Sequence, residues 1–221
     1  MVRQGYYFGL PLLGAAAAAF LLRWHAAGFV LAFLALFVFS FFRDPDRNIP
    51  SGPGCVVSPA DGRVVVVTPE SHAGRPGTRI SIFLAIWNVH VNRSPAAGTI
   101  AALDYRPGRF YAAMRERASL ENEQNVITLR TGAGEIVFKQ IAGWIARRVV
   151  CWKRPGDAVA RGERIGLVRF GSRVDLWLPA DSEIRVKVGD SVKGGSSILA
   201  LWPVLPAEQS TVQRDPARIA T

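Results

Sequence analysis

Gly156-Asp157-Ala158-Val159-Ala160-Arg161-Gly162 is a stretch that occurs twice in this chain. The second copy, Gly189-Asp190-Ser191-Val192-Lys193-Gly194-Gly195, begins 33 residues later, and the two share the pattern Gly-Asp-x-Val-x-x-Gly. An apolar segment follows each copy, at 165–168 and at 198–201. Glycine and aspartate favour tight turns, and short apolar runs between such turns are typical of strands. The sequence therefore predicts a turn-and-strand unit that is built twice.

Further strands are predicted on both sides of the first copy, with Gly, Pro, Asn and Asp between them. They cover residues 56–57, 63–67, 79–86, 125–130, 135–141, 148–152, 165–170, 174–178 and 183–188. In this region only 109–120 has a helical composition. The repeated turns resemble those of lipoyl- and biotinyl-type domains, which are flattened β structures made of two similar halves. No lysine attachment motif lies between the copies. We therefore expect a mainly β (α+β) fold with a lipoyl- or barrel-sandwich-like domain that is not a swinging-arm carrier.

The N-terminus has a different character. Residues 6–22 and 26–42 are almost entirely apolar, and Arg23-Trp24-His25 separates them. Each half has about the shortest length that crosses a bilayer as a helix, roughly 17 residues. We expect a helical hairpin embedded in the membrane, with Arg3, Arg43 and Arg47 holding both ends on the cytoplasmic side. A single long tilted helix and a buried soluble hairpin are the alternatives. A cleavable signal peptide fits poorly, because the apolar stretch is doubled.

These patterns divide the chain into three parts. Residues 1–45 form the hydrophobic hairpin and its linker, 46–205 form the β-rich domain, and the polar tail 206–221 is expected to be disordered. The formal charge is +10, from 27 Lys and Arg against 17 Asp and Glu. Such an excess suits nucleic acid or an anionic membrane leaflet. Because no nucleic-acid motif is present, the membrane is the expected partner. Cys55 and Cys151 lie far apart and are expected to be reduced thiols.

A Gly-Ser step follows the predicted strand 165–170. Glycine carries no Cβ, so the hydroxyl of Ser172 can fold back onto the carbonyl of Gly171. The product would be an ester and then a broken chain. Most Gly-Ser pairs are simple turns, so the step carries weight only if partners exist elsewhere.

Two other segments supply partners for this serine. Asp61 lies in the turn at 58–62, and His90 follows the apolar run 80–86. The other histidines are His25, in the apolar N-terminus, and His72, in a glycine-proline loop. An imidazole oriented by a carboxylate accepts a serine proton near neutral pH. The three residues thus form a candidate Asp-His-Ser set, against the plainer roles of a turn-capping aspartate and a core histidine.

The segments Ser58-Pro-Ala-Asp61-Gly62, Val89-His90-Val-Asn-Arg93 and Phe170-Gly-Ser172-Arg173 resemble the three signature segments of the phosphatidylserine decarboxylase family. The chain is similar to the short, archaeal-type bacterial subfamily. This resemblance implies a proenzyme that cuts itself between Gly171 and Ser172, with help from Asp61 and His90. Residues 1–171 would become the β chain, and Ser172 would become a pyruvoyl group at the start of the α chain.

The same resemblance implies the substrate and the products. Phosphatidylserine in the membrane would lose CO₂ to give phosphatidylethanolamine, with the pyruvoyl group as electron sink and without a metal. Longer relatives carry a second histidine where this chain has Trp87, so the protonation role sometimes given to that histidine has no evident owner. We expect the protein at the cell membrane with its β-rich domain on the cytoplasmic face, and we expect self-cleavage to need that domain only. A homo-oligomer is left open.

Two other classes compete with this interpretation. A membrane-tethered, lipoyl-like adaptor or carrier without catalytic activity would explain the repeat and the hairpin, but not the segments around Asp61, His90 and Ser172. A metallopeptidase would need further histidines at ligand spacing, and 89–92 lacks them.

Overall fold

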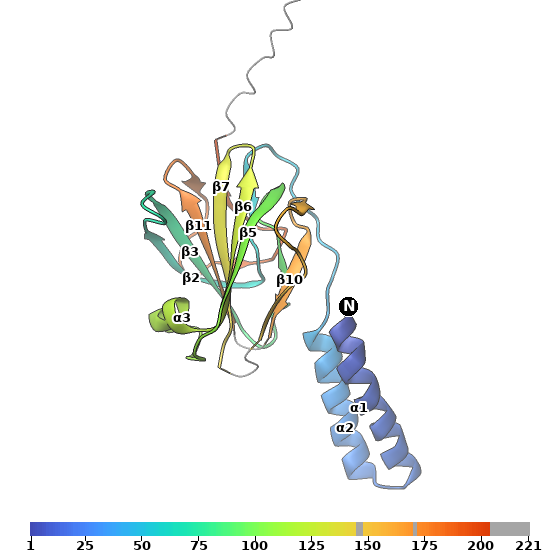
Figure 1. The fold of residues 1–221 in the computed structure, drawn as a ribbon. Coiled ribbons are helices and arrows are strands. Elements are labelled where there is room, and N and C mark those ends of the chain that lie inside the picture. The colour runs from blue at the N-terminus through green and yellow to red at the C-terminus, as the bar shows by residue number, and fades with distance from the viewer. Residues whose placement is uncertain (145–147, 170–171, 204–221) are drawn as a thin grey trace, which may run out of the picture.

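The computed structural model describes residues 1–144, 148–169 and 172–203. Helices α1 (Arg3–Leu21) and α2 (His25–Phe41) form a hairpin that projects from one end of a β-rich body (Figure 1). They match the predicted segments 6–22 and 26–42 and the break between them. The tail 206–221, for which we expected disorder, lies outside the described residues.

Small residues bring the two helices close together. A Cβ on Gly9 would lie 2.4 Å from the ring of Phe39, and one on Gly28 would lie 2.7 Å from the ring of Phe20. In the part of the chain that the structure describes, no helix combines the length and the apolar character needed to cross a membrane. Large apolar side chains on the hairpin are nevertheless exposed, among them Leu21, Phe29, Phe33 and Leu36, with exposed fractions of 68% to 86%. The hairpin thus presents an apolar surface that the β body leaves uncovered.

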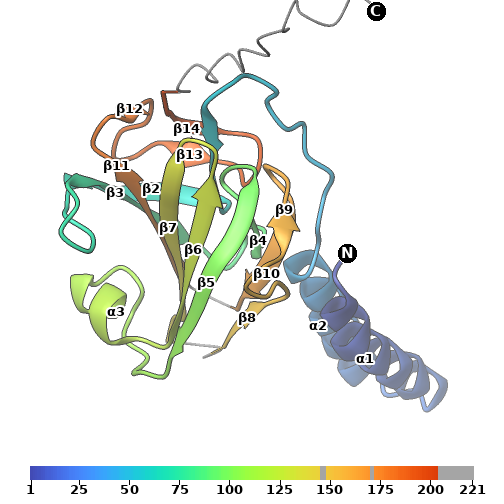
Figure 2. The same cartoon turned by 45° about the horizontal axis from the view of Figure 1, so that its top comes forward.

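An eight-stranded antiparallel sheet with the order β13-β2-β3-β11-β7-β6-β5-β9 forms most of the body. Its strands are β2 (Gly62–Pro69), β3 (Gly77–Leu84), β5 (Gly98–Arg106), β6 (Gln124–Thr131), β7 (Gly134–Ile141), β9 (Ala158–Val159), β11 (Ser172–Pro179) and β13 (Ser191–Val192). Alternate residues face one side of a sheet, and here that side carries the main core, with Ile82, Phe138 and Leu176 fully buried. Figure 2 shows the sheet curving from β2 and β3 round to β5 and β9.

Two three-stranded sheets complete the body. One has the order β1-β14-β12 and the other β4-β10-β8. Their strands are β1 (Cys55–Val57), β4 (Val91–Arg93), β8 (Val149–Cys151), β10 (Arg164–Val168), β12 (Glu183–Ile184) and β14 (Ile198–Leu201). The expected mainly β, α+β fold with an N-terminal helical hairpin is confirmed.

The repeated stretch occupies equivalent places at the two edges of the large sheet. In the first copy the carboxylate of Asp157 accepts a hydrogen bond from the backbone N–H of Arg154, at 2.8 Å. In the second copy Asp190 accepts one from Lys187, at 2.9 Å. The glycines of the pattern have φ between +74° and +100°, where a side chain is strained: Gly156, Gly162, Gly189 and Gly195. Strand β9 pairs with β5 and strand β13 with β2, so each copy covers one edge of the sheet.

Some local predictions were wrong. The predicted helix 109–120 is reduced to α3 (Glu116–Glu121). The side chain of Asn122 accepts from the backbone N–H of Tyr111 at 2.8 Å and donates to its carbonyl at 2.9 Å, which holds that segment out of a helix. The predicted strand 183–188 ends at Ile184. Strand β5 was missed, because its alternation of apolar with small and charged residues is weak and its pairing with β6 is long-range.

Candidate active site

The segments that carry Asp61 and Ser172 meet at one end of the large sheet. Leu84, the last residue of β3, pairs with Ser172, the first residue of β11. On the other side of β3, Gly62 lies so close that a Cβ there would come 2.1 Å from the carbonyl oxygen of Phe83. Asp61 directly precedes Gly62. Two strand spacings therefore separate this aspartate's strand from the serine's, about 10 Å.

The loop after β3 brings His90 to the same end. It begins with a turn in which the backbone N–H of Asn88 donates to the carbonyl of Ala85, at 2.9 Å. His90 follows, and its carbonyl accepts a hydrogen bond from the backbone N–H of Val168, the last residue of β10, at 3.2 Å. Because β10 ends four residues before Ser172, this bond ties the histidine to the segment that leads to β11. Within the described residues, no hydrogen bond joins Nε2 of His90 to Oγ of Ser172.

The imidazole of His90 is fully buried, and its tautomer is fixed by a neighbour. Its Nδ1 lies 2.8 Å from the carbonyl oxygen of Asn88. A carbonyl only accepts, so Nδ1 carries the proton and Nε2 carries the lone pair. Burial, reinforced by the positive charge of Arg43, lowers the pKa of His90 from 6.5 to about 4. At neutral pH the ring is therefore uncharged and able to accept a proton at Nε2.

Ser172 is also fully buried, and its Oγ has no hydrogen-bond partner among the described residues. The preceding Gly171, and with it the bond expected to be cut, lies outside the described residues. The next residue, Arg173, is buried on the other face of the strand, where it donates to Asp175 at 2.5 Å and to Ser81 at 2.8 Å. The serine thus starts a strand that is firmly anchored from its second residue onward.

Asp61 has other partners than the expected one. Its carboxylate accepts hydrogen bonds from Arg47 at 2.8 and 3.0 Å and from the backbone N–H of Gly194 at 2.7 Å. The prediction that Asp61 orients His90 is therefore corrected, because the guanidinium and the amide take up its oxygens and Asn88 orients the imidazole. A role of Asp61 in self-cleavage stays a prediction.

The inner end of the hairpin belongs to the site. The ring of Phe41 packs against the imidazole of His90, with centroids 4.2 Å apart. One core cluster joins both ends of the hairpin to the segment around the histidine: Val2, Phe41, Phe42, Val89, Val91 and Leu167. The expectation that self-cleavage needs only the β-rich domain does not fit this packing. The domain bounds themselves stay a prediction.

A cleft of about 530 Å³ opens beside Asp61. It is lined by Asp61, Gly62, Arg63, Phe83, Ala85, Trp87, Asn88, Ser191, Val192 and Lys193. Trp87 is 73% exposed there, and its carbonyl accepts a hydrogen bond from Arg43 at 2.6 Å. The cleft reaches Asn88, which orients the imidazole, but neither His90 nor Ser172 lines it.

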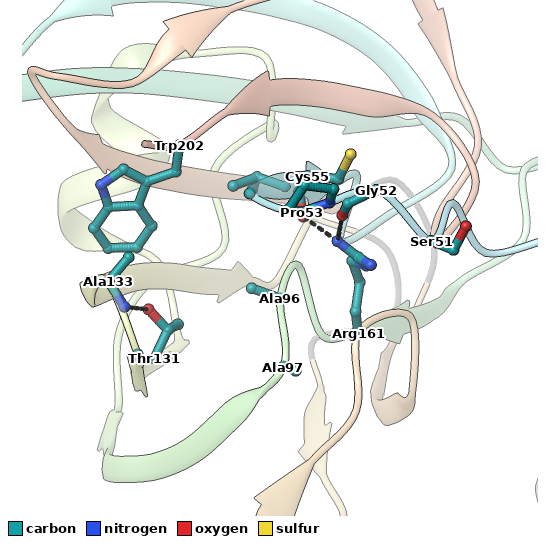
Figure 3. A pocket seen from close by; sticks show the side chains of 13 residues that line it. Ser51, Gly52, Pro53, Cys55, Ala96, Ala97, Thr131, Ala133, Arg161 and Trp202 are labelled. Atoms are coloured by element: carbon teal, nitrogen blue, oxygen red, sulfur yellow. Dashed lines mark hydrogen bonds between the residues drawn. The ribbon is translucent and has the colours of Figure 1, made fainter. Parts of the chain in front are cut away.

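Figure 3 shows a second pocket, of about 320 Å³. Trp202, Arg161 and Ala133 are among its lining residues, and Arg161 donates to the carbonyls of Gly52 and Cys55 at 2.8 and 3.0 Å. Ala133 lies in the β6–β7 turn, whereas Ile141, at the other end of β7, pairs with Arg173. Seven residues of strand separate these ends, about 23 Å. This pocket is therefore no part of the candidate active site.

Comparison with known proteins identifies the family of this chain. A family model described as phosphatidylserine decarboxylase matches residues 34–200. The chain belongs to the phosphatidylserine decarboxylase family. A relative from Solibacter usitatus, named phosphatidylserine decarboxylase proenzyme, is 50% identical over 200 residues, which cover 90% of this chain and 96% of the relative.

Two further relatives carry the same name. The protein of Aromatoleum aromaticum is 47% identical over 202 residues, covering 88% of this chain and 94% of its own length. That of Burkholderia pseudomallei is 44% identical over 205 residues, covering 90% and 95%. The resemblance drawn from the three segments is thereby confirmed, as is the expectation of an enzyme of this family. The archaeal-type subfamily stays a prediction.

Sequence reasoning missed three residues that the structure adds to the site: Arg47, Asn88 and Phe41. The only signal for Arg47 was its place in a linker with two aspartates and two arginines, a composition that suits ion pairs with the body. One such pair joins Asp44 to Arg93 of the second signature segment, at 2.8 Å. For Phe41 the apolar run gave no signal, because nothing in it distinguishes one phenylalanine from the next.

Proposed function

We propose that the chain is a proenzyme that cuts itself between Gly171 and Ser172 and then decarboxylates phosphatidylserine with a pyruvoyl group derived from Ser172. The observation that carries the proposal is the buried Oγ of Ser172, which lies at a strand start and has no hydrogen-bond partner among the described residues. A buried, neutral histidine is hydrogen-bonded through its carbonyl to Val168, four residues before this serine. The names of the relatives support it, since a proenzyme is a precursor that must be processed.

The residues around Ser172 fit a group formed from that serine. A buried hydroxyl without a partner costs free energy, and Ser172 shows no partner among the described residues, which favours a chemical role for it. The strand beyond it is fixed by the Arg173 contacts, so the same atoms stay in place when the preceding bond is cut. When present, the pyruvoyl group supplies a ketone that engages the substrate amine and accepts the electron pair left by CO₂.

The self-cleavage chemistry needs few groups. Nε2 of His90 takes the proton of Ser172, whose Oγ attacks the carbonyl carbon of Gly171 and replaces the peptide nitrogen, so that the amide becomes an ester. Removal of the Cα proton of Ser172 then expels the carboxylate of Gly171. One water molecule converts the resulting dehydroalanine into the ketone and ammonia. The neutral imidazole suits the first step, because a charged one could not accept the proton.

The membrane is part of the proposal. The hairpin presents exposed apolar side chains on both helices, including Tyr7, Leu13, Phe29 and Phe33. An exposed apolar helical surface of this kind is stabilised when it leaves water for the apolar interior of a bilayer. The inner end of the hairpin contacts His90, so a lipid headgroup at that level would lie near the site. We propose that the β-rich body faces the cytoplasmic leaflet, and that the α and β chains remain associated after cleavage.

Intact mass combined with an activity assay tests the proposal. Wild type should consist of residues 1–171 and a shorter chain whose N-terminus is blocked, and it should release CO₂ from phosphatidylserine. Ser172→Ala should remain one chain and release none. A wild type that stays uncut while it decarboxylates would refute the pyruvoyl route. An uncut and inactive wild type would favour the adaptor instead.

A further inference from the structure

Two arginines at the junction of the hairpin and the β body form no ion pair with any carboxylate of the described residues. Arg148 precedes β8 and Arg169 follows β10, and these strands pair with Val149 opposite Val168. The backbone N–H of Arg169 donates to the carbonyl of Arg148, at 3.2 Å. The backbones of the two arginines are thus held side by side by strand pairing.

The guanidinium of Arg169 is held in place, but no described carboxylate pairs with it. It lies over the ring of Phe8 in α1, 5.5 Å from the centroid. Its buried Nε has no hydrogen-bond acceptor in the residues described. Burial lowers the pKa of Arg169, the charge of Arg148 lowers it further, and no carboxylate offsets either effect. Arg169 is half-buried and Arg148 is exposed, so water screens their repulsion only in part, and an anion that joined them would relieve it.

The pair lies where the phosphate of a bound phosphatidylserine is expected. Arg169 lies three residues before Ser172, and its other side rests on the hairpin through Phe8. In phosphatidylserine the phosphate lies between the acyl chains and the serine amine. A lipid whose acyl chains follow the hairpin would therefore bring its phosphate to this pair as its amine reaches the site.

The carboxylate of the substrate is the competing anion, and the chemistry disfavours it. An arginine pair that held the carboxylate would stabilise the ground state and oppose the loss of CO₂. The phosphate keeps its charge throughout the reaction, so its binding energy is available to position the headgroup. The planar guanidinium also matches the geometry of phosphate oxygens.

We propose that Arg148 and Arg169 form the binding site for the phosphodiester of the lipid headgroup. This inference rests on the proposed function. It assigns the pair a positioning role, and neither arginine takes part in bond making or breaking.

Steady-state kinetics on a short-chain, monomeric phosphatidylserine test the site without a bilayer. Arg148→Gln and Arg169→Gln should raise KM about tenfold or more, the size of one charge-assisted hydrogen bond, and change kcat far less. The control is Arg130→Gln, which removes the same charge from a 70% exposed side chain beside the β6–β7 turn. It should leave both constants unchanged. Both test variants should still be cut into two chains.

Competitors separate the lipid headgroup from free phosphate. Glycerophosphoserine should inhibit wild type at concentrations where inorganic phosphate has no effect, and Arg148→Gln should lose this inhibition. Equal inhibition by the two compounds would assign the pair to free phosphate and overturn the proposal. Arg169→Gln could fail to cut itself. In that case, calorimetry measures the affinity of uncut chains for glycerophosphoserine. Ser172→Ala should bind it, and Ser172→Ala/Arg148→Gln should bind it more weakly.

Two results would overturn the inference while leaving the proposed function intact. One is that wild type is active and that Arg148→Gln and Arg169→Gln have the same KM as wild type. The other is a loss of vesicle binding in the variants with an unchanged KM for the monomeric substrate, which would make the arginines a surface contact. An inactive wild type would instead refute the proposed function itself.

Discussion

Arg173 and Asp175 form a fully buried ion pair on the face of β11 opposite the core, with Nε and Oδ1 2.5 Å apart. Arg79 and Ser119 also contact this carboxylate, at 3.6 and 2.5 Å. The pair begins one residue after the serine that we propose becomes a chain end. A strand that loses its covalent connection on one side tends to fray, and the ion pair fixes the second residue of that strand.

The first prediction concerns this ion pair. Arg173→Met leaves Asp175 buried with only part of its partners, and we expect a loss of about 3 kcal/mol in the free energy of unfolding. The measurement is urea denaturation in the uncut Ser172→Ala background, where the chain is continuous. Arg173→Met/Asp175→Leu should recover most of the loss. A single variant as stable as its parent would show that the ion pair does not anchor the strand.

The second prediction concerns pH and His90. Its pKa in the folded protein is about 4, below the ordinary 6.5, so the neutral base persists well into the acid range. Self-cleavage should keep its rate from pH 8 to about pH 5 and fall only near pH 4. His90→Ala should slow it about 10²–10⁴-fold at pH 7. A rate that already halves near pH 6.5 would contradict the lowered pKa.

The same histidine makes stability depend on pH. Between pH 6.5 and about 4 the unfolded chain binds a proton that the folded chain does not, so stability falls as the pH is lowered through this window. The full effect is about 3 kcal/mol. In the Ser172→Ala background, His90→Phe should remove this slope, as judged by thermal melts at several pH values. An equal slope in both chains would assign it to other groups.

The third prediction concerns Asp61 and Arg47. Because Asp61 binds the linker arginine rather than His90, Asp61→Asn and Arg47→Gln should slow self-cleavage to a similar extent, and each less than His90→Ala. The double variant should be no slower than the slower single variant, since both changes remove one contact. Gel analysis of freshly refolded protein gives the rates. Additive effects would mean that Asp61 acts independently of Arg47.

The fourth prediction separates the two ends of the hairpin. Phe41→Ala should slow self-cleavage, because it removes the ring that packs against His90. Phe33→Ser, at a side chain that is 69% exposed, should leave self-cleavage unchanged and weaken binding to lipid vesicles. The first is read by gel and the second by vesicle co-sedimentation. Vesicle binding that is equal in wild type and Phe33→Ser would argue against an apolar contact of this surface with lipid.

The sequence alone determined the parts of this protein that depend on local pattern. The hairpin follows from two apolar runs, and the β-rich body follows from short strands between turn residues. The repeated Gly-Asp-x-Val-x-x-Gly stretch predicted two like turns, because its glycines need positive φ and its aspartates bond to their own turns. The segments around Asp61, His90 and Ser172 were likewise enough to identify the family.

Tertiary structure decided which partner each of these residues takes. Asp61 binds Arg47 and Gly194, and His90 is oriented by Asn88 and packed by Phe41. Such choices depend on which donors and rings long-range strand pairing brings within reach, and sequence spacing does not encode them. The same holds for Arg148 and Arg169, which no carboxylate of the described residues pairs, since a charge is paired or unpaired only once the fold has placed its neighbours.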